Sequence, residues 1–227
     1  MLLVKTETVL SSLIDNEPSV IPVLNRFGIG LGTGDVSVAQ ICREKHIDTE
    51  FFLAIVNTFI NESYFPEHKL REFDAAEIAA YLEETNNYYS QFQLANIERH
   101  FRLLMQSVGP DSNIHLLLDF FHELRDAILT RVQTDCELLF PVLKGKPLSD
   151  EVFVLVNSMA ETDAGIADRL SDLKSMFVKH LRGTCDNNLL YAVIVAIITL
   201  EKDIRQNNRI RARLLCPLLT AAINTIE

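Results

Sequence analysis

NNLLYAVIVAIITLEKDIRQNNRIRARLLCPLL, residues 187–219, is the stretch that decides the fold. Its apolar residues recur at the three- and four-residue spacing of one face of an α-helix: Val193, Ala196, Leu200, Ile204, Ile210, Leu214 and Leu218. The longest apolar run, residues 189–200, is too short to span a bilayer. We therefore predict a long helix that is buried along one face against other helices.

Three further stretches have the same character, at about 74–103, 112–143 and 149–180. Each begins near a residue that can cap a helix, namely Asp74, Ser112 and Ser149. Glycine and proline are scarce, with 8 and 7 residues in a chain of 227, which favours helix over a turn-rich β architecture. The sequence predicts an all-α protein with an up-down four-helix bundle over residues 70–227.

A short repeat relates the second of these predicted helices to the fourth. LLFPVL, residues 138–143, ends one, and LLCPLL, residues 214–219, ends the other. The same pattern at the ends of two alternate helices indicates two related helical hairpins.

Polar residues interrupt the apolar stripes at matched places. Counted back from the proline of each repeat, Arg131 and Asp135 correspond to Asn207 and Arg211, and each pair lies one turn apart on the stripe. Thr162 interrupts the stripe of the third helix. We expect these side chains at the bundle centre, where metal-binding bundles hold their ligands. The alternative is that the arginine stems extend to the bundle end and reach water.

For residues 1–65 the sequence predicts a separate, small domain of short helices. Its glycine-rich stretch, GIGLGTG at 28–34, does not fit a dinucleotide-binding loop, because no strand precedes it and Thr33 stands where a glycine is required. We interpret it as tight turns. Residues 37–59 resemble a helix-turn-helix, but the second helix offers Phe51, Phe52 and Asn57 rather than the Arg and Lys that contact DNA.

The net charge and the cysteines indicate which classes of partner and which cellular compartment to expect. The net charge of −10 repels phosphate backbones and anionic lipid heads, so we expect neither nucleic-acid binding nor membrane contact. The four cysteines are far apart, without a CxxC spacing, and no signal-like segment opens the chain. Thiols of this kind are typical of a reducing compartment, and we expect a cytoplasmic protein.

Four short motifs carry a family resemblance: NRFGI at 25–29, YLEETNNYY at 81–89, LLFP at 138–141 and LEKDI at 200–204. With these motifs, and over nearly its whole length, the chain resembles the iron–sulfur-cluster repair di-iron proteins. This resemblance implies a small N-terminal domain joined to a hemerythrin-like bundle that holds a di-iron cofactor. In that family, the second and fourth helices each carry His-x-x-x-Glu ahead of Leu-Phe-Pro.

The ligand positions that this resemblance implies hold other residues. They fall at Asn86 or Asn87, Arg131, Asp135, Thr162, Asn207 and Arg211. The family's N-terminal cysteine pair falls at Gly32 and Thr33. Metal ligands donate electron pairs, whereas arginine donates protons and stays charged, so it cannot ligate. We therefore expect a degenerate site with no metal and no cofactor.

Charge balance suggests what replaces the metal. An uncompensated buried charge costs several kcal/mol, so we expect Arg131 and Arg211 to pair with Asp135, with Glu84 as a further candidate partner. The positive guanidinium groups of the two arginines would then replace the positive charge of the metal.

The sequence contains no serine, cysteine or histidine motif for nucleophilic catalysis, so we expect no enzyme activity. We predict a non-enzymatic hemerythrin-like protein with a metal-free polar core and a protein-interaction or regulatory role; a homodimer is compatible with the sequence. The resemblance alone links it to nitrosative or oxidative stress. The alternatives are a di-iron cluster-repair protein with an unusual ligand set, a DNA-binding regulator acting through residues 37–59, and a binder of an apolar ligand between the helices.

Overall fold

The computed structural model describes residues 3–66, 68 and 72–224. Over these residues the chain is helical, and its one β feature is an isolated bridge between Val9 and Ser37. The all-α prediction is confirmed. The chain divides into two compact units, Met1–Thr85 and Asn86–Glu227.

The first unit is built from short helices. They are α1 (Leu10–Asn16), the 3-10 turn η1 (Pro18–Val20), α2 (Ile21–Arg26), α3 (Val38–Lys45), α4 (Thr49–Ile60) and the first part of α6 (Ala75–Tyr88). Ser37 accepts a hydrogen bond from the backbone N–H of Gln40, and Asp48 caps α4 in the same way. Gly28, Gly32 and Gly34 adopt positive φ, so the glycine-rich stretch forms turns.

An aromatic cluster explains where the first unit ends. The ring of Phe27 lies 5.0 Å from that of Phe52, 5.3 Å from that of Tyr81 and 6.0 Å from that of Phe51, centroid to centroid. Tyr81 belongs to α6, so the first turns of that helix pack with the small helices. The boundary between the units therefore falls within α6, later than the expected boundary near residues 65–70.

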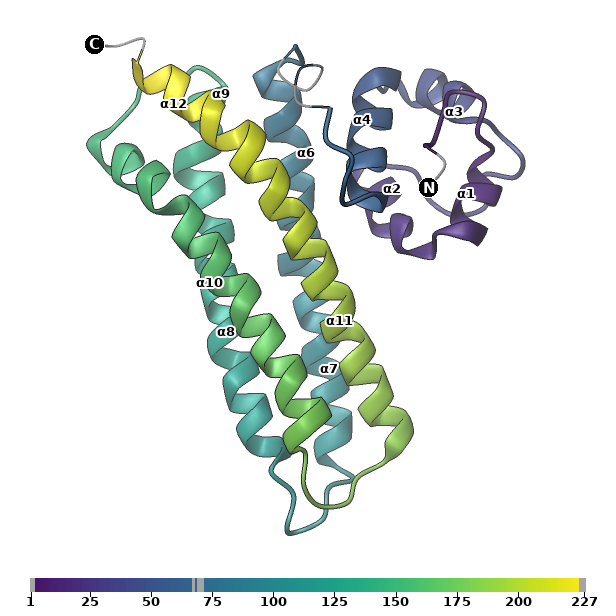
Figure 1. The fold of residues 1–227 in the computed structure, drawn as a ribbon, viewed down its shortest axis with the longest axis vertical. Coiled ribbons are helices and arrows are strands. Elements are labelled where there is room, and N and C mark those ends of the chain that lie inside the picture. Colours follow the sequence, from purple (N-terminus) through teal and green to yellow (C-terminus); the bar gives the residue numbers. More distant parts are fainter. Residues whose placement is uncertain (1–2, 67, 69–71, 225–227) are drawn as a thin grey trace. The chain divides into compact units, whose positions relative to one another are not determined.

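Four long helices form the second unit: α7 (Leu94–Met105), α8 (Ile114–Thr134), α10 (Asp150–His180) and α11 (Asn187–Ile210). They run side by side (Figure 1), and contacts of α7 with α8, α8 with α10, α10 with α11 and α11 with α7 close a ring. Its interior is a continuous apolar cluster that includes Phe101, Phe121, Leu170 and Ile197. This ring of helices is called the bundle below.

Within the described residues, π-helical segments interrupt three helices of the bundle. They are η2 (Tyr89–Gln93) before α7, η3 (Asp135–Leu139) between α8 and α9 (Phe140–Leu143), and η4 (Arg211–Leu215) between α11 and α12 (Cys216–Asn224). After η3 and η4, the N–H groups of Phe140 and Cys216 bond the carbonyls of Asp135 and Arg211, five residues back.

The repeated prolines account for two of these segments. Pro141 and Pro217 lie in the turns that follow η3 and η4. A proline has no N–H, and its ring clashes with the carbonyl four residues earlier in a regular helix. A π turn just before the proline shifts the hydrogen-bond register and relieves this conflict. The sequence repeat is therefore a pair of equivalent shifted helix ends, and α9 and α12 contact each other.

Candidate functional site

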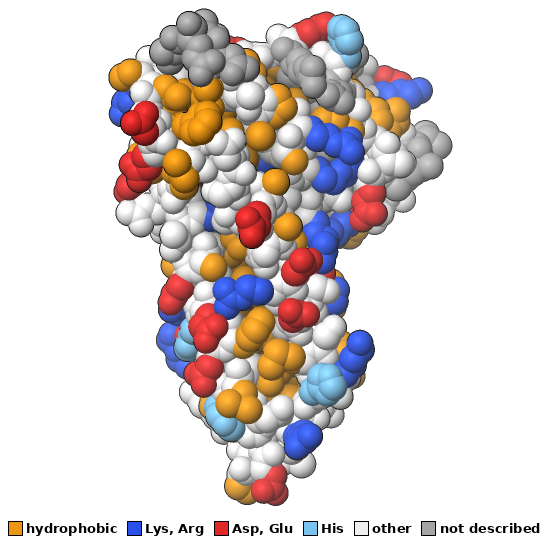
Figure 2. Space-filling view, turned by 60° about the vertical axis from the view of Figure 1, so that its left-hand side comes forward, with side chains coloured by type: hydrophobic (Ala, Val, Ile, Leu, Met, Phe, Trp, Pro, Cys, Tyr) orange, Lys and Arg blue, Asp and Glu red, His pale blue; other side chains and the backbone are white. Residues whose placement is uncertain are grey.

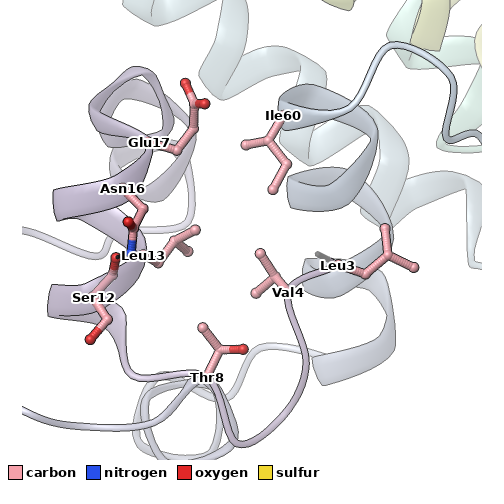
Figure 3. A pocket seen from close by; sticks show the side chains of 8 residues that line it. All are labelled: Leu3, Val4, Thr8, Ser12, Leu13, Asn16, Glu17 and Ile60. Atoms are coloured by element: carbon pink, nitrogen blue, oxygen red, sulfur yellow. Dashed lines mark hydrogen bonds between the residues drawn. The ribbon is translucent and has the colours of Figure 1, made fainter. Parts of the chain in front are cut away.

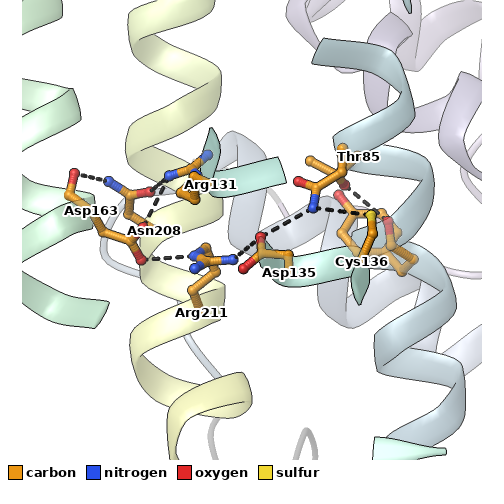
Figure 4. A network of polar contacts seen from close by, with 9 residues as sticks. Thr85, Arg131, Asp135, Cys136, Asp163, Asn208 and Arg211 are labelled. Carbon is orange, nitrogen blue, oxygen red and sulfur yellow. Dashed lines mark hydrogen bonds and ion pairs between the residues drawn. The ribbon is translucent and has the colours of Figure 1, made fainter. Parts of the chain in front are cut away.

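A buried network of ion pairs crosses the bundle (Figure 4). Arg211, the first residue of η4, donates from Nε to Oδ2 of Asp163 on α10 over 2.7 Å, and from Nη1 to Oδ2 of Asp135, the first residue of η3. Arg131 on α8 donates from Nη1 to Oδ1 of Asp163 over 3.1 Å. Two arginines thus alternate with two aspartates, and the formal charges of the network cancel.

Neutral amides complete the network. Asn86 donates from Nδ2 to Oδ2 of Asp135 over 3.1 Å. Asn208 accepts from Nη1 of Arg131 over 2.9 Å and donates to the backbone carbonyl of Asp163 over 2.8 Å. These contacts restrict the orientation of the charged groups that they bond, because each hydrogen bond in a buried polar network limits the geometry of its partners.

The network is almost completely removed from solvent. The exposed fractions of Arg131, Asp135, Asp163 and Arg211 are 4%, 0%, 5% and 2%. Burial by itself lowers the pKa of Arg211, but the carboxylates of Asp135 and Asp163 outweigh that effect and raise the pKa above its ordinary value. Arg211 therefore stays charged, and its charge requires both carboxylates.

The predicted site residues of the second and fourth helices lie in the bundle interior. Both arginines are buried, so the alternative in which their stems reach water at the bundle end is wrong. The predicted pairing of Arg211 with Asp135 is confirmed. The predicted pairing of Arg131 with Asp135 is wrong, because the ion pair of Arg131 is with Asp163 on the neighbouring helix α10.

The outcomes differ among the other predicted positions. Of the two asparagines left open on the first helix, Asn86 is buried and bonds to Asp135, whereas Asn87 is exposed. Thr162 is exposed, and its neighbour Asp163 occupies the centre of the network. Glu84 is also exposed, and Asp163 is the second carboxylate of the network.

Asp163 is the charged residue of the candidate site that sequence reasoning missed. It lies four residues after Met159, three before Ile166 and seven before Leu170, all of them buried, so the apolar periodicity of α10 admits it as well as Thr162. The pairing of the Asp163 carboxylate with two arginines distinguishes it from Thr162. That pairing forms between helices, so the sequence of α10 alone does not show it.

Asn207 is buried at 3% exposure, as predicted for the stripe, but it takes no part in the network. Neither its Oδ1 nor its Nδ2 makes a hydrogen bond within the described residues. The next residue, Asn208, makes the contacts to Arg131 and Asp163 instead.

A pocket of about 350 Å³ lies beside the network. It is lined from α8, η3, α10 and η4, with Arg131, Asp135 and Arg211 among its lining residues. Arg131 Nε, Arg131 Nη2 and Asp135 Oδ1 are buried and make no hydrogen bond within the described residues. The pocket therefore adjoins polar groups whose hydrogen-bonding capacity is only partly used.

The cation at the centre of the site is a guanidinium group. Arg211 lies between the carboxylates of Asp135 and Asp163, and an arginine cannot donate an electron pair to a metal. In the described part of the chain, no three His, Cys, Asp or Glu side chains are grouped so as to hold a metal ion. The residues at the implied ligand positions do not fit a di-iron centre.

A second pocket, of about 440 Å³, belongs to the first unit (Figure 3). Val4, Leu13 and Ile60 give it an apolar wall, and Asn16 and Glu17 give it a polar edge. Its lining is mainly apolar.

Helix α4 offers little surface for contacting DNA. Phe51, Phe52, Ala54, Ile55, Val56, Asn57, Thr58 and Phe59 are all buried. The amide of Asn57 accepts from the backbone N–H of Val4 over 2.8 Å and donates to its carbonyl over 2.9 Å, so it holds the N-terminal segment. On the bundle face in Figure 2, acidic and basic side chains are mixed rather than gathered into a basic band.

Among the described residues, no helix combines the length and the apolar character that crossing a membrane requires. Comparison of the chain with protein-family models, with curated proteins and with solved structures finds no match.

Proposed function

We propose that this protein is a non-enzymatic, hemerythrin-like scaffold in which a buried arginine–aspartate network stands in place of a di-iron centre. Its role is regulatory and is exerted through binding, in the cytoplasm. The resemblance of the sequence to the cluster-repair proteins suggests nitrosative or oxidative stress as the setting of that role.

The position of Arg211 carries this proposal. Its Nε and Nη1 groups bond to carboxylates from two different helices, Asp163 and Asp135, as a metal ion would bridge ligands from facing helices. A charged hydrogen-bond donor at that point supplies positive charge without redox chemistry or an open coordination position. A site of this kind holds the helices together but supplies no oxygen or iron chemistry.

Metal analysis tests the proposal. The full chain is purified aerobically from iron-replete cells, and a second sample is incubated anaerobically with ferrous iron and then desalted. Far less than one iron atom per chain is expected in both samples, because Arg211 occupies the position between the carboxylates. Close to two iron atoms per chain in either sample would show a working di-iron protein and overturn the proposal.

An exposed apolar stripe on α11 supports the binding role. Tyr191, Val195 and Ile198 are 65%, 59% and 46% exposed, and their spacing of four and three residues puts them on one face of the helix. Apolar residues grouped on one exposed face are typical of protein contacts. A second copy of the chain is the partner that we propose to test first.

Sedimentation equilibrium tests this surface. Val195→Glu places a charge in the stripe and is expected to weaken self-association. Val178→Glu makes the same change at another exposed position, on α10, and is the matched control. A protein that is monomeric at all concentrations, or equal weakening by both variants, rules out the α11 stripe as a dimer surface.

DNA binding through residues 37–59 is an alternative function, and a mobility-shift assay tests it directly. A mobility shift with random duplex that disappears as salt rises would favour it. The burial of α4 and the acidic net charge predict no shift.

A further inference from the structure

We propose that the pocket beside the network binds a small carboxylic acid with an apolar body, and that Arg131 recognises the carboxylate. The inference rests on the proposed function in one respect, namely that guanidinium groups rather than a metal hold the centre of the bundle.

The hydrogen bonds of Arg131 are the first argument. Its Nη1 serves both Asp163 and Asn208, whereas Nε and Nη2 make no hydrogen bond within the described residues. Nε and Nη2 form one edge of the guanidinium plane, and their two N–H groups point in parallel. That edge matches the two oxygens of a carboxylate, which it can bind in a bidentate manner.

Arg211 does not offer the same opportunity. Its Nε and Nη1 are already bonded to Asp163 and Asp135. The two arginines of the network therefore divide their work: Arg211 joins the two aspartates, and Arg131 anchors to one aspartate while keeping a free edge. An unsatisfied buried donor lowers stability, so a ligand that satisfies this edge gains free energy from it.

The walls of the pocket suit the rest of the molecule. Ala127, Leu139, Leu155 and Met159 are apolar lining residues. A volume of about 350 Å³ is at the low end for small-molecule sites, which are mostly apolar and carry a few orienting polar groups. The pocket therefore suits a single-ring or short-chain acid rather than a nucleotide or a peptide.

Asp135 refines the chemistry of the ligand. Its Oδ2 accepts from Arg211 and Asn86, but its Oδ1 makes no hydrogen bond within the described residues. This oxygen repels a second carboxylate and accepts from a hydroxyl group. A 2-hydroxy acid is therefore expected to bind more tightly than the corresponding acid without the hydroxyl.

The free edge of Arg131 is covered, so a side chain must move before the ligand can reach it. Arg131 is a lining residue, but its Nε and Nη2 atoms are buried. Met159 lines the same pocket, and a methionine side chain has three rotatable bonds and adapts readily to a new neighbour. We expect Met159 to move when the acid binds.

Isothermal titration calorimetry of the full chain tests the inference with three probes: mandelate, phenylacetate and the neutral phenylacetamide. The expected order of affinity is mandelate, then phenylacetate, then phenylacetamide, with the amide at least about tenfold weaker than phenylacetate because it cannot form the charged bidentate pair. Equal affinity of the acid and the amide, or no binding of either acid, overturns the inference.

Variants locate the site. Arg131→Lys keeps the charge but removes the planar edge, and it is expected to weaken phenylacetate at least about tenfold. Ser158→Phe fills the pocket from a half-buried lining position and is expected to abolish binding. Asn157→Phe is the matched control, because Asn157 is exposed and does not line the pocket. Binding that survives Ser158→Phe, or that is lost in Asn157→Phe, overturns the assignment, even if Arg131→Lys does not fold.

The two proposals fail separately. Iron bound at the network would overturn the proposed function, whatever the calorimetry shows. A metal-free chain that binds neither acid would overturn only the pocket assignment.

Discussion

The Nε group of Arg211 lies 2.7 Å from Oδ2 of Asp163, and both side chains are buried. Asp163 also accepts from Arg131 through its other oxygen. One carboxylate on α10 therefore holds arginines from two different helices, α8 and the end of α11. This arrangement ties three helices together at one level of the bundle and makes each charge depend on the others.

Removing Arg211 is expected to be costly. Arg211→Met leaves Asp135 and Asp163 with only Arg131 to compensate them, and a broken buried ion pair costs about 3–5 kcal/mol of unfolding free energy. Urea unfolding followed by circular dichroism measures the loss.

A double variant is the control for this charge argument. Arg211→Met combined with Asp135→Asn removes one charge of each sign and leaves the Arg131–Asp163 pair in balance. It should be more stable than Arg211→Met alone, since the two changes are coupled. A double variant that is no more stable than the single one would show that packing, not charge, determines the loss.

Asp163 and Thr162 provide a second matched pair. Asp163→Asn leaves two buried arginines with one carboxylate, so we expect a loss of about 3–5 kcal/mol. Thr162→Ala changes an exposed residue and should stay within about 0.5 kcal/mol of the parent. Equal effects in chemical denaturation would contradict the central place of Asp163.

Two glycines are predicted to respond in opposite ways to alanine. Gly183 has φ of +78°, and a Cβ there would lie 2.7 Å from backbone atoms of Ser112, so Gly183→Ala should lower stability by more than about 1 kcal/mol. Gly165 lies within α10, where a Cβ meets nothing within 4 Å, so Gly165→Ala should raise stability by about 0.5–1 kcal/mol. Thermal unfolding compares them, and a shift of the same sign in both would be inconsistent with these geometries.

His100 predicts a pH dependence. Burial lowers the pKa of His100, and the charge of Arg99 lowers it further. The unfolded chain therefore binds the proton more readily, and the stability that depends on neutral His100 is lost as pH falls below about 6.5. His100→Gln should make the midpoint of thermal unfolding fall less steeply between pH 7 and pH 5. Parallel pH profiles would refute this.

Thiol reactivity should follow burial. Cys136 is exposed, whereas Cys42 is fully buried, and burial raises the pKa of the Cys42 thiol, which lowers its thiolate fraction. A brief iodoacetamide pulse followed by mass spectrometry should label Cys136 first and Cys42 only after unfolding. Early labelling of Cys42 would show that the first unit opens readily.

Much of the helical pattern could be predicted from local sequence. The helix starts at Ser37 and Ser149 were predictable because a capping side chain acts within the next turn. The long helix of residues 187–219 was predictable because its apolar spacing repeats over many turns, although the π segment η4 within it was not. A π turn shifts the helical register by one residue, so positions after it no longer follow a strict period of 3.6.

The sequence by itself determined that Arg131, Asp135 and Arg211 would lie on buried helix faces, because helical periodicity is a local property of the chain. Only the tertiary structure decided which charges pair. Arg131 bonds to Asp163 rather than to Asp135, its neighbour one turn away, and Asn86 rather than Asn87 reaches the network. These choices depend on how facing helices are rotated, and a rotation by one residue turns a side chain through about 100°. The charge of Arg211 was thus predictable, but its place between two aspartates from different helices required the assembled bundle.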